Sequence, residues 1–68
     1  MQLSARNQLR GRIANVRTGT VMAEVEIDIG TGTPSVAAIT RGSAESMHLA
    51  VEDQVVTVIK STEVIVAK

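Results

Sequence analysis

The sequence contains no cysteine and no aromatic residue, and both absences limit how a chain of 68 residues can be stabilised. Without cysteine there is no disulfide and no thiolate metal site, and a single histidine does not supply the ligands of a structural zinc ion. A domain of this length buries only about 60% of the surface of its unfolded chain, and aromatic side chains are the largest contributors to such a core. We therefore expect the chain to gain stability by self-association.

Charge of one sign is not in excess either, because seven Lys and Arg residues balance seven Asp and Glu residues. A chain with no net charge is not attracted as a whole to nucleic acid or to an anionic membrane, which argues against both as partners. The distribution is uneven, however, since the first acidic residue is Glu24. The basic residues before it are Arg6, Arg10, Arg12 and Arg17. We expect an anion site to draw on this basic N-terminal stretch.

Long apolar runs are missing as well. No run approaches the roughly 18 residues that cross a membrane. The first residues also lack the apolar stretch of a signal peptide. The sequence therefore predicts a cytoplasmic protein.

Alternation of apolar and polar residues dominates what is present, and this period of two is typical of β-strands. In residues 21–29 it is uninterrupted, with valine, alanine or isoleucine at every odd position. The other predicted strands are residues 9–16, 36–40, 55–59 and 64–67. In the first of these, Val16 falls out of phase with Ile13, which predicts a bulge near Ala14. The last three are apolar on both faces, which predicts that another subunit covers the second face.

A short helix is predicted between the third and fourth strands. Ser43 is a suitable N-cap, and Glu45 places negative charge in the first turn, where the helix dipole favours it. Ala44, Met47 and His48 share a face at i, i+3, i+4 spacing, and the helix is expected to end near Leu49.

The resulting order of three strands, one helix and two strands is that of the OB-fold, a small and partly open Greek-key barrel. We therefore predict an all-β, OB-fold-like, five-stranded small barrel with one short helix between strands 3 and 4. A single domain over residues 1–68 is expected to form it.

No group of residues in the sequence suits catalysis. His48 has no cysteine to activate, and it is expected to be a packing or surface residue. Glu24, Glu26 and Asp28 lie on one face of a strand, which predicts a solvated surface and not an acid–base pair. Residues 30–32 (Gly-Thr-Gly) lack the third glycine and the following helix of a dinucleotide-binding loop. The sequence therefore predicts that the protein is not an enzyme and needs no catalytic cofactor.

Two segments are rich in hydrogen-bond donors and contain no carboxylate: residues 4–8 (Ser-Ala-Arg-Asn-Gln) and residues 60–62 (Lys-Ser-Thr). Arginine and lysine carry permanent positive charge at neutral pH, while hydroxyl and free backbone N–H groups are directional donors. A tetrahedral dianion with four acceptor oxygens requires this mixture. From the residues alone, the alternative is that the segments form a polar strand end and a turn.

Together these segments resemble the molbindin family, the small molybdenum–pterin-binding or Mop proteins. The resemblance rests on Ser-Ala-Arg-Asn-Gln-Leu-x-Gly at residues 4–11, Ala-Ile-Thr at 38–40 and Val-Ile-Lys-Ser-Thr at 58–62. It covers essentially the whole chain. It implies an OB-like fold, a hexamer built as a trimer of dimers, and binding of molybdate or tungstate between subunits for storage and molybdenum homeostasis.

The resemblance also implies which residues hold the oxyanion. They are the Ser4 and Arg6 side chains, the Ala5 backbone N–H, Lys60, Ser61 and, from a different subunit, Thr40. The metal is then bound as its oxyanion, with no direct protein ligand. Because there is no aromatic ring on which a pterin could stack, we expect the free anion to be the ligand.

Two alternatives of other classes remain open at this point. One is an OB-fold nucleic-acid-binding module, although such proteins stack bases on aromatic side chains along a basic groove, and this chain has neither feature. The other is a protein-interaction or sensory domain that acts on a partner protein when an anion binds.

Overall fold

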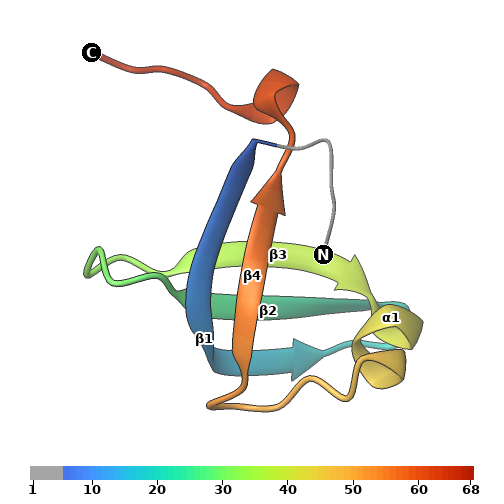
Figure 1. Cartoon of the computed structure of the whole chain (residues 1–68). Coiled ribbons are helices and arrows are strands. Elements are labelled where there is room, and N and C mark those ends of the chain that lie inside the picture. The colour runs from blue at the N-terminus through green and yellow to red at the C-terminus, as the bar shows by residue number, and fades with distance from the viewer. Residues whose placement is uncertain (1–5) are drawn as a thin grey trace.

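The computed structural model describes residues 6–68 and shows a curled antiparallel sheet with one short α-helix (Figure 1). Its elements are β1 (Asn7–Thr18), β2 (Met22–Asp28), β3 (Ser35–Thr40), α1 (Arg41–Ser46), β4 (Gln54–Ile59) and the 3-10 helix η1 (Ser61–Glu63). The strand order is β3-β2-β1-β4, with antiparallel neighbours throughout. The half-barrel, with its helix after the third strand, confirms the predicted OB-like architecture.

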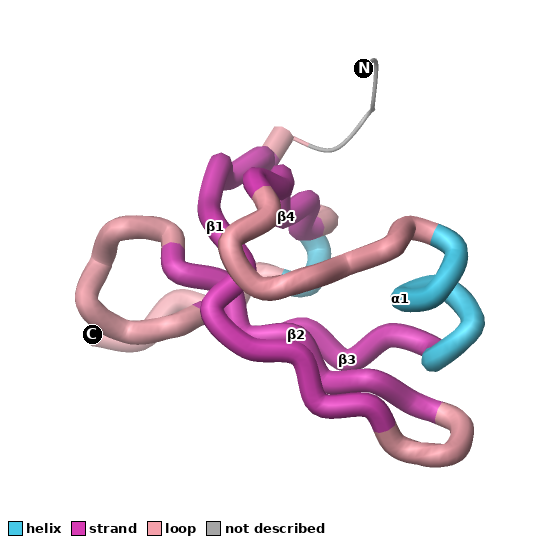
Figure 2. The backbone as a smooth tube through the Cα atoms, turned by 90° about the horizontal axis from the view of Figure 1, so that it is seen from below, coloured by secondary structure: helices cyan, strands magenta, loops and turns pink. Residues whose placement is uncertain are grey.

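Strand β1 curls the sheet because its two halves pair with different partners. Residues 7–12 pair with β4, and residues 12–18 pair with β2. A bulge between Ile13 and Asn15 shifts the register there, which confirms the bulge predicted at Ala14. As a result, β1 and β4 run steeply across β2 and β3 in Figure 1, and the tube in Figure 2 shows the sheet folding over on itself.

The core is small and lies on the concave side of this curl. Its buried centre consists of Ile13, Val25 and Ile27, and alternate residues of β2 are buried as their sequence pattern predicts. The partly buried residues packed against this centre are Val16, Ile29, Ala37, Ile39, Leu49 and Val55. So limited a core agrees with the expectation that the chain requires additional burial from outside itself.

Gly11 allows the close approach of β1 to β2 at the point where β1 changes partner. A Cβ atom added there would lie 2.7 Å from the backbone oxygen of Asp28 and 2.8 Å from Cγ2 of Ile27. Gly11→Ala is therefore expected to lower the free energy of unfolding by about 1.5 kcal/mol through overpacking. Urea denaturation measures this loss. Gly42→Ala is the matched control, because its Cβ would meet nothing within 4 Å and alanine favours the helix. An equal loss of stability in both variants would show that overpacking at Gly11 is not the cause.

Helix α1 begins earlier than predicted. Thr40, not Ser43, is the N-cap, since the backbone N–H of Ser43 donates to Thr40 Oγ1 at 3.1 Å. Thr40 ends β3 in an extended conformation, which aims its hydroxyl at the first helical turn. His48 has a left-handed backbone (φ 52°) just past the end of the helix and is exposed, so its predicted place on the apolar face is wrong. No helix among residues 6–68 is long and apolar enough to cross a membrane.

The predicted fifth strand does not form within the single chain. After η1 the chain continues as an extended segment that leads away from its own sheet (Figure 1). Val64 is 49%, Ile65 91% and Val66 88% exposed. The sheet of one chain therefore has four strands, because the sequence pattern specifies the tendency to form a strand but not the partner for it.

Candidate oxyanion site

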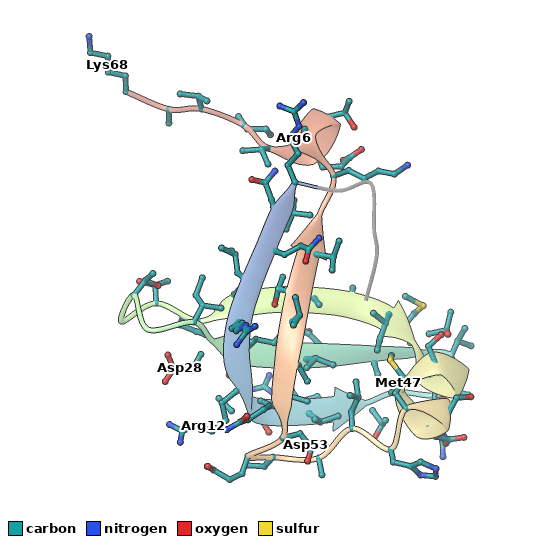
Figure 3. All side chains as sticks on the ribbon, viewed as in Figure 1. Arg6, Arg12, Asp28, Met47, Asp53 and Lys68 are labelled. Atoms are coloured by element: carbon teal, nitrogen blue, oxygen red, sulfur yellow. The ribbon has the colours of Figure 1, made fainter. Side chains whose placement is uncertain are left out.

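The pairing of β1 with β4 brings the two donor-rich segments together at one end of the sheet. Asn7 pairs with Ile59, so Arg6 and Lys60 are the next residues outward along two antiparallel neighbours. Figure 3 shows Arg6 beside η1, the turn that contains Ser61. Arg6, Lys60 and Ser61, which are far apart in the sequence, thus lie at the same end of the sheet.

The cationic side chains at this end have no carboxylate partner. The described part of the chain contains two ion pairs, Arg12 with Glu52 at 3.5 Å and Arg41 with Glu45 at 2.8 Å, and neither involves Arg6 or Lys60. Both of these side chains are on exposed residues. Their charge is consequently available to an anion from outside.

Glu63 also lies at this end of the sheet, in η1, and is not among the predicted site residues. It closes the 3-10 turn that begins at Ser61, and its backbone N–H donates to the Lys60 carbonyl oxygen at 2.9 Å. The turn therefore places a carboxylate two residues from Ser61. An anion held by Lys60 and Ser61 would be repelled by Glu63 unless the latter points into solvent, where its charge is screened.

Thr40 lies at the opposite end of β1 from Arg6 and Lys60 within one chain. It pairs with Met22, next to the end of β1, whereas Arg6 and Lys60 lie beyond the start of β1. β1 has 12 residues and extends on the order of 35 Å along its path. The Thr40 hydroxyl also caps α1 and donates to Ser43 Oγ at 2.8 Å. Within the described part of one chain, Thr40 is therefore not brought together with Arg6, Lys60 and Ser61.

Ser4 and Ala5 lie outside the described residues, so their roles stay predictions. They immediately precede Arg6 in the sequence, which is the first described residue. The described half of the predicted site consists of Arg6, Lys60 and Ser61.

A second concave surface contains arginines but differs in its chemistry. It lies where β1 crosses from β4 to β2 and includes Arg10, Arg12, Asp28 and Gln54. Arg12 is paired with Glu52, and a backbone N–H donates to Asp28 at 2.8 Å, so both signs of charge are present. This surface suits a dianion less well than the end with Arg6. No cluster of three or more His, Asp or Glu residues able to hold a bare metal ion occurs within residues 6–68.

Comparison with known proteins gives concordant results. The family model of the TOBE domain matches residues 3–66. A probable molybdenum-pterin-binding protein from Haemophilus influenzae is 36% identical over 66 residues, which cover 97% of this chain and 96% of that protein. A solved molybdate-binding protein from Sporomusa ovata has 40% identity and a TM-score of 0.93, with 100% of both chains covered. MopII from Clostridium pasteurianum has 33% identity and a TM-score of 0.91, covering 98% of this chain and 100% of that one.

These matches cover the strands, the helix and both donor segments. They confirm the resemblance to the molbindin family that was inferred from residues 4–11, 38–40 and 58–62. The relatives also match almost end to end in length. The chain belongs to the TOBE-domain family and, within it, to the molbindins.

Proposed function

We propose that this protein binds molybdate as a free oxyanion, at sites formed where chains of a homo-oligomer meet. The observation that carries the proposal is the register of β1 and β4, which sets Arg6 beside Lys60 and Ser61. The molybdenum-pterin-binding and molybdate-binding relatives support this choice of ligand. The proposed ligands are Ser4, Ala5, Arg6, Thr40, Lys60 and Ser61.

The chemistry of molybdate matches a surface made of donors. At neutral pH its four oxygens accept hydrogen bonds and donate none, and bonds from cationic donors are roughly twice as strong as neutral ones. Phosphate is partly protonated at this pH, and its proton would face another donor with no acceptor opposite. Tungstate has the same charge and nearly the same size, so the site is expected to accept both. Sulfate is smaller, and the size of the cavity must discriminate against it.

A site between chains is supported by the separation of Thr40 from Lys60 and Ser61 within one chain. If Thr40 is a ligand, it comes from a different subunit. Exposed apolar residues on the strands also favour association, since Val36 of β3 is 55% and Val58 of β4 is 42% exposed. The molbindin resemblance favours a hexamer built as a trimer of dimers.

Storage, buffering or delivery of the anion in the cytoplasm is the proposed role, in place of catalysis. The sole histidine, His48, is exposed beyond the end of α1 and has no described ion-pair partner. The sequence has no aromatic ring for stacking a pterin, which favours the free anion over a pterin compound.

Molybdate is expected to raise the thermal stability of the oligomer by mass action. At a free concentration about 100 times the Kd, a ligand adds about 2.7 kcal/mol to the free energy of unfolding. Thermal denaturation of anion-free protein in equal concentrations of molybdate, tungstate, sulfate and phosphate measures the effect. We expect Tm to rise with molybdate and tungstate only. An unchanged Tm in molybdate, or an equal rise in sulfate, would contradict the proposed function.

A further inference from the structure

A carboxylate stands at the end of the sheet that otherwise displays donors. Glu63 is the sole acidic side chain in residues 1–23 and 54–68, the stretches that contain β1, β4 and η1. Figure 3 shows Arg6 beside η1, whereas Lys68 lies far along the extended C-terminal segment. An anion held by Lys60 and Ser61 would therefore have Glu63 as its acidic neighbour along the chain.

The backbone of η1 fixes where Glu63 lies relative to these donors. Its N–H donates to the Lys60 carbonyl oxygen at 2.9 Å, which is the i to i+3 bond of a 3-10 turn. Side chains three positions apart are eclipsed in such a turn. Glu63 is thus held on the same side of the turn as Lys60 and two residues from Ser61.

The fold does not use the charge of Glu63. The residue is exposed, and its carboxylate makes no ion pair and no hydrogen bond with other side chains or backbone groups of residues 6–68. A helix of three residues has few aligned peptide dipoles that a negative charge could stabilise. The charge is consequently free to act on whatever lies beside Lys60.

The electrostatic effect on an anion follows from the charges present. Arg6 and Lys60 supply two positive charges, and Glu63 offsets one of them. Repulsion from Glu63 is twice as large for a dianion as for a monoanion at the same distance. Because these residues are exposed, solvent weakens this repulsion and added salt weakens it further.

We propose that Glu63 sets the strength of oxyanion binding by repelling the bound dianion, which keeps binding readily reversible. This inference rests on the proposed function and deepens it, since it names a residue that determines how firmly the anion is held. Glu63 is not a ligand and acts through space on the dianion and on Lys60. A protein that stores or delivers an anion must also release it, and this carboxylate favours release.

Removing the charge of Glu63 is expected to tighten binding. In isothermal titration of the anion-free protein at low salt, Glu63→Gln should lower the Kd for molybdate about fivefold, as expected for one charge near an exposed dianion. Glu63→Ala should give a similar gain, because the missing charge and not a new amide contact is the cause. The gain should shrink between roughly 0.02 M and roughly 0.5 M salt. A gain that is confined to Glu63→Gln, or that does not change with salt, would contradict repulsion as the cause.

Three controls separate this effect from a change in the fold or in net charge. Glu63→Asp keeps the charge, so its Kd should lie within about twofold of that of the unsubstituted protein. Glu24→Gln makes the same substitution on an exposed residue opposite Arg17, at the far end of β1, and should also change Kd less than about twofold. The Tm of anion-free Glu63→Gln should stay within about 3 °C, as expected for a surface substitution.

The outcomes distinguish this inference from the proposed function. If the unsubstituted protein binds molybdate, and neither Glu63→Gln nor Glu63→Ala binds it more tightly, the role of Glu63 is overturned and the proposed function stands. An equal gain in Glu24→Gln would likewise overturn it, because net charge would then be the cause. If none of these proteins binds molybdate, both proposals are overturned.

Discussion

Replacing Arg6 by alanine is expected to weaken molybdate binding about thirtyfold, which corresponds to about 2 kcal/mol. Arg6 lies beside Lys60 at the open end of the β1–β4 pair and has no ion-pair partner among the described residues. Its guanidinium can donate two parallel hydrogen bonds to an oxyanion, and bonds of this charge-assisted kind are the strongest available to the site. Isothermal titration of the anion-free protein measures the change.

Arg10→Ala is the matched control for this prediction. It removes the same charge four residues farther along the chain, within β1, where the arginine lines a different surface. Its effect should be within about twofold, as expected for a distant and screened charge. Arg6→Lys keeps the charge but loses the planar fork, so its affinity should be intermediate. Equal weakening in the Arg6 and Arg10 variants would show a general effect of charge and not a contact at Arg6.

Ile13→Ala is expected to have the largest effect on stability, a loss of about 3 to 4 kcal/mol in the free energy of unfolding. Ile13 is 1% exposed and packs with Val25 and Ile27 at the centre of the core. In so small a core, few neighbouring side chains could move to fill the cavity that the substitution leaves. Urea denaturation at constant protein concentration measures the loss, because the stability of the proposed oligomer depends on concentration.

Val21→Ala is the control for the core prediction. It removes apolar atoms from a residue that is 70% exposed in the turn between β1 and β2, and its loss should be about 0.5 kcal/mol. If Ile13→Ala cost no more than this control, the buried cluster would not be the core of the folded protein.

Much of the sheet is predictable from local pattern. The alternation in β2 is strict because one of its faces packs on the core, and the phase change at Val16 marks the bulge beside Ala14. The helix cap is harder to predict, since Thr40 and Ser43 are both hydroxyl residues and either can cap. Only the extended backbone at the end of β3 selects Thr40. The partner of residues 64–67 is not encoded by their own pattern at all.

The candidate site is likewise predictable from the sequence only in part. The residue types at 4–6 and 60–61 are visible in the sequence, and so is their suitability for an oxyanion. The proximity of Arg6 to Lys60 depends on the register of β1 and β4, a non-local pairing that no spacing rule supplies. The remoteness of Thr40 and the closeness of Glu63 to Ser61 likewise appear only when the chain is folded.

The most direct test of the central claim is anomalous X-ray scattering at the molybdenum edge from crystals grown with molybdate. This measurement locates the metal without assuming which residues bind it. We predict a peak between chains, with oxyanion oxygens within hydrogen-bonding distance of Arg6 and Lys60. A peak on the second concave surface, beside Arg10 and Arg12, would contradict the account. So would the absence of a peak in crystals saturated with molybdate.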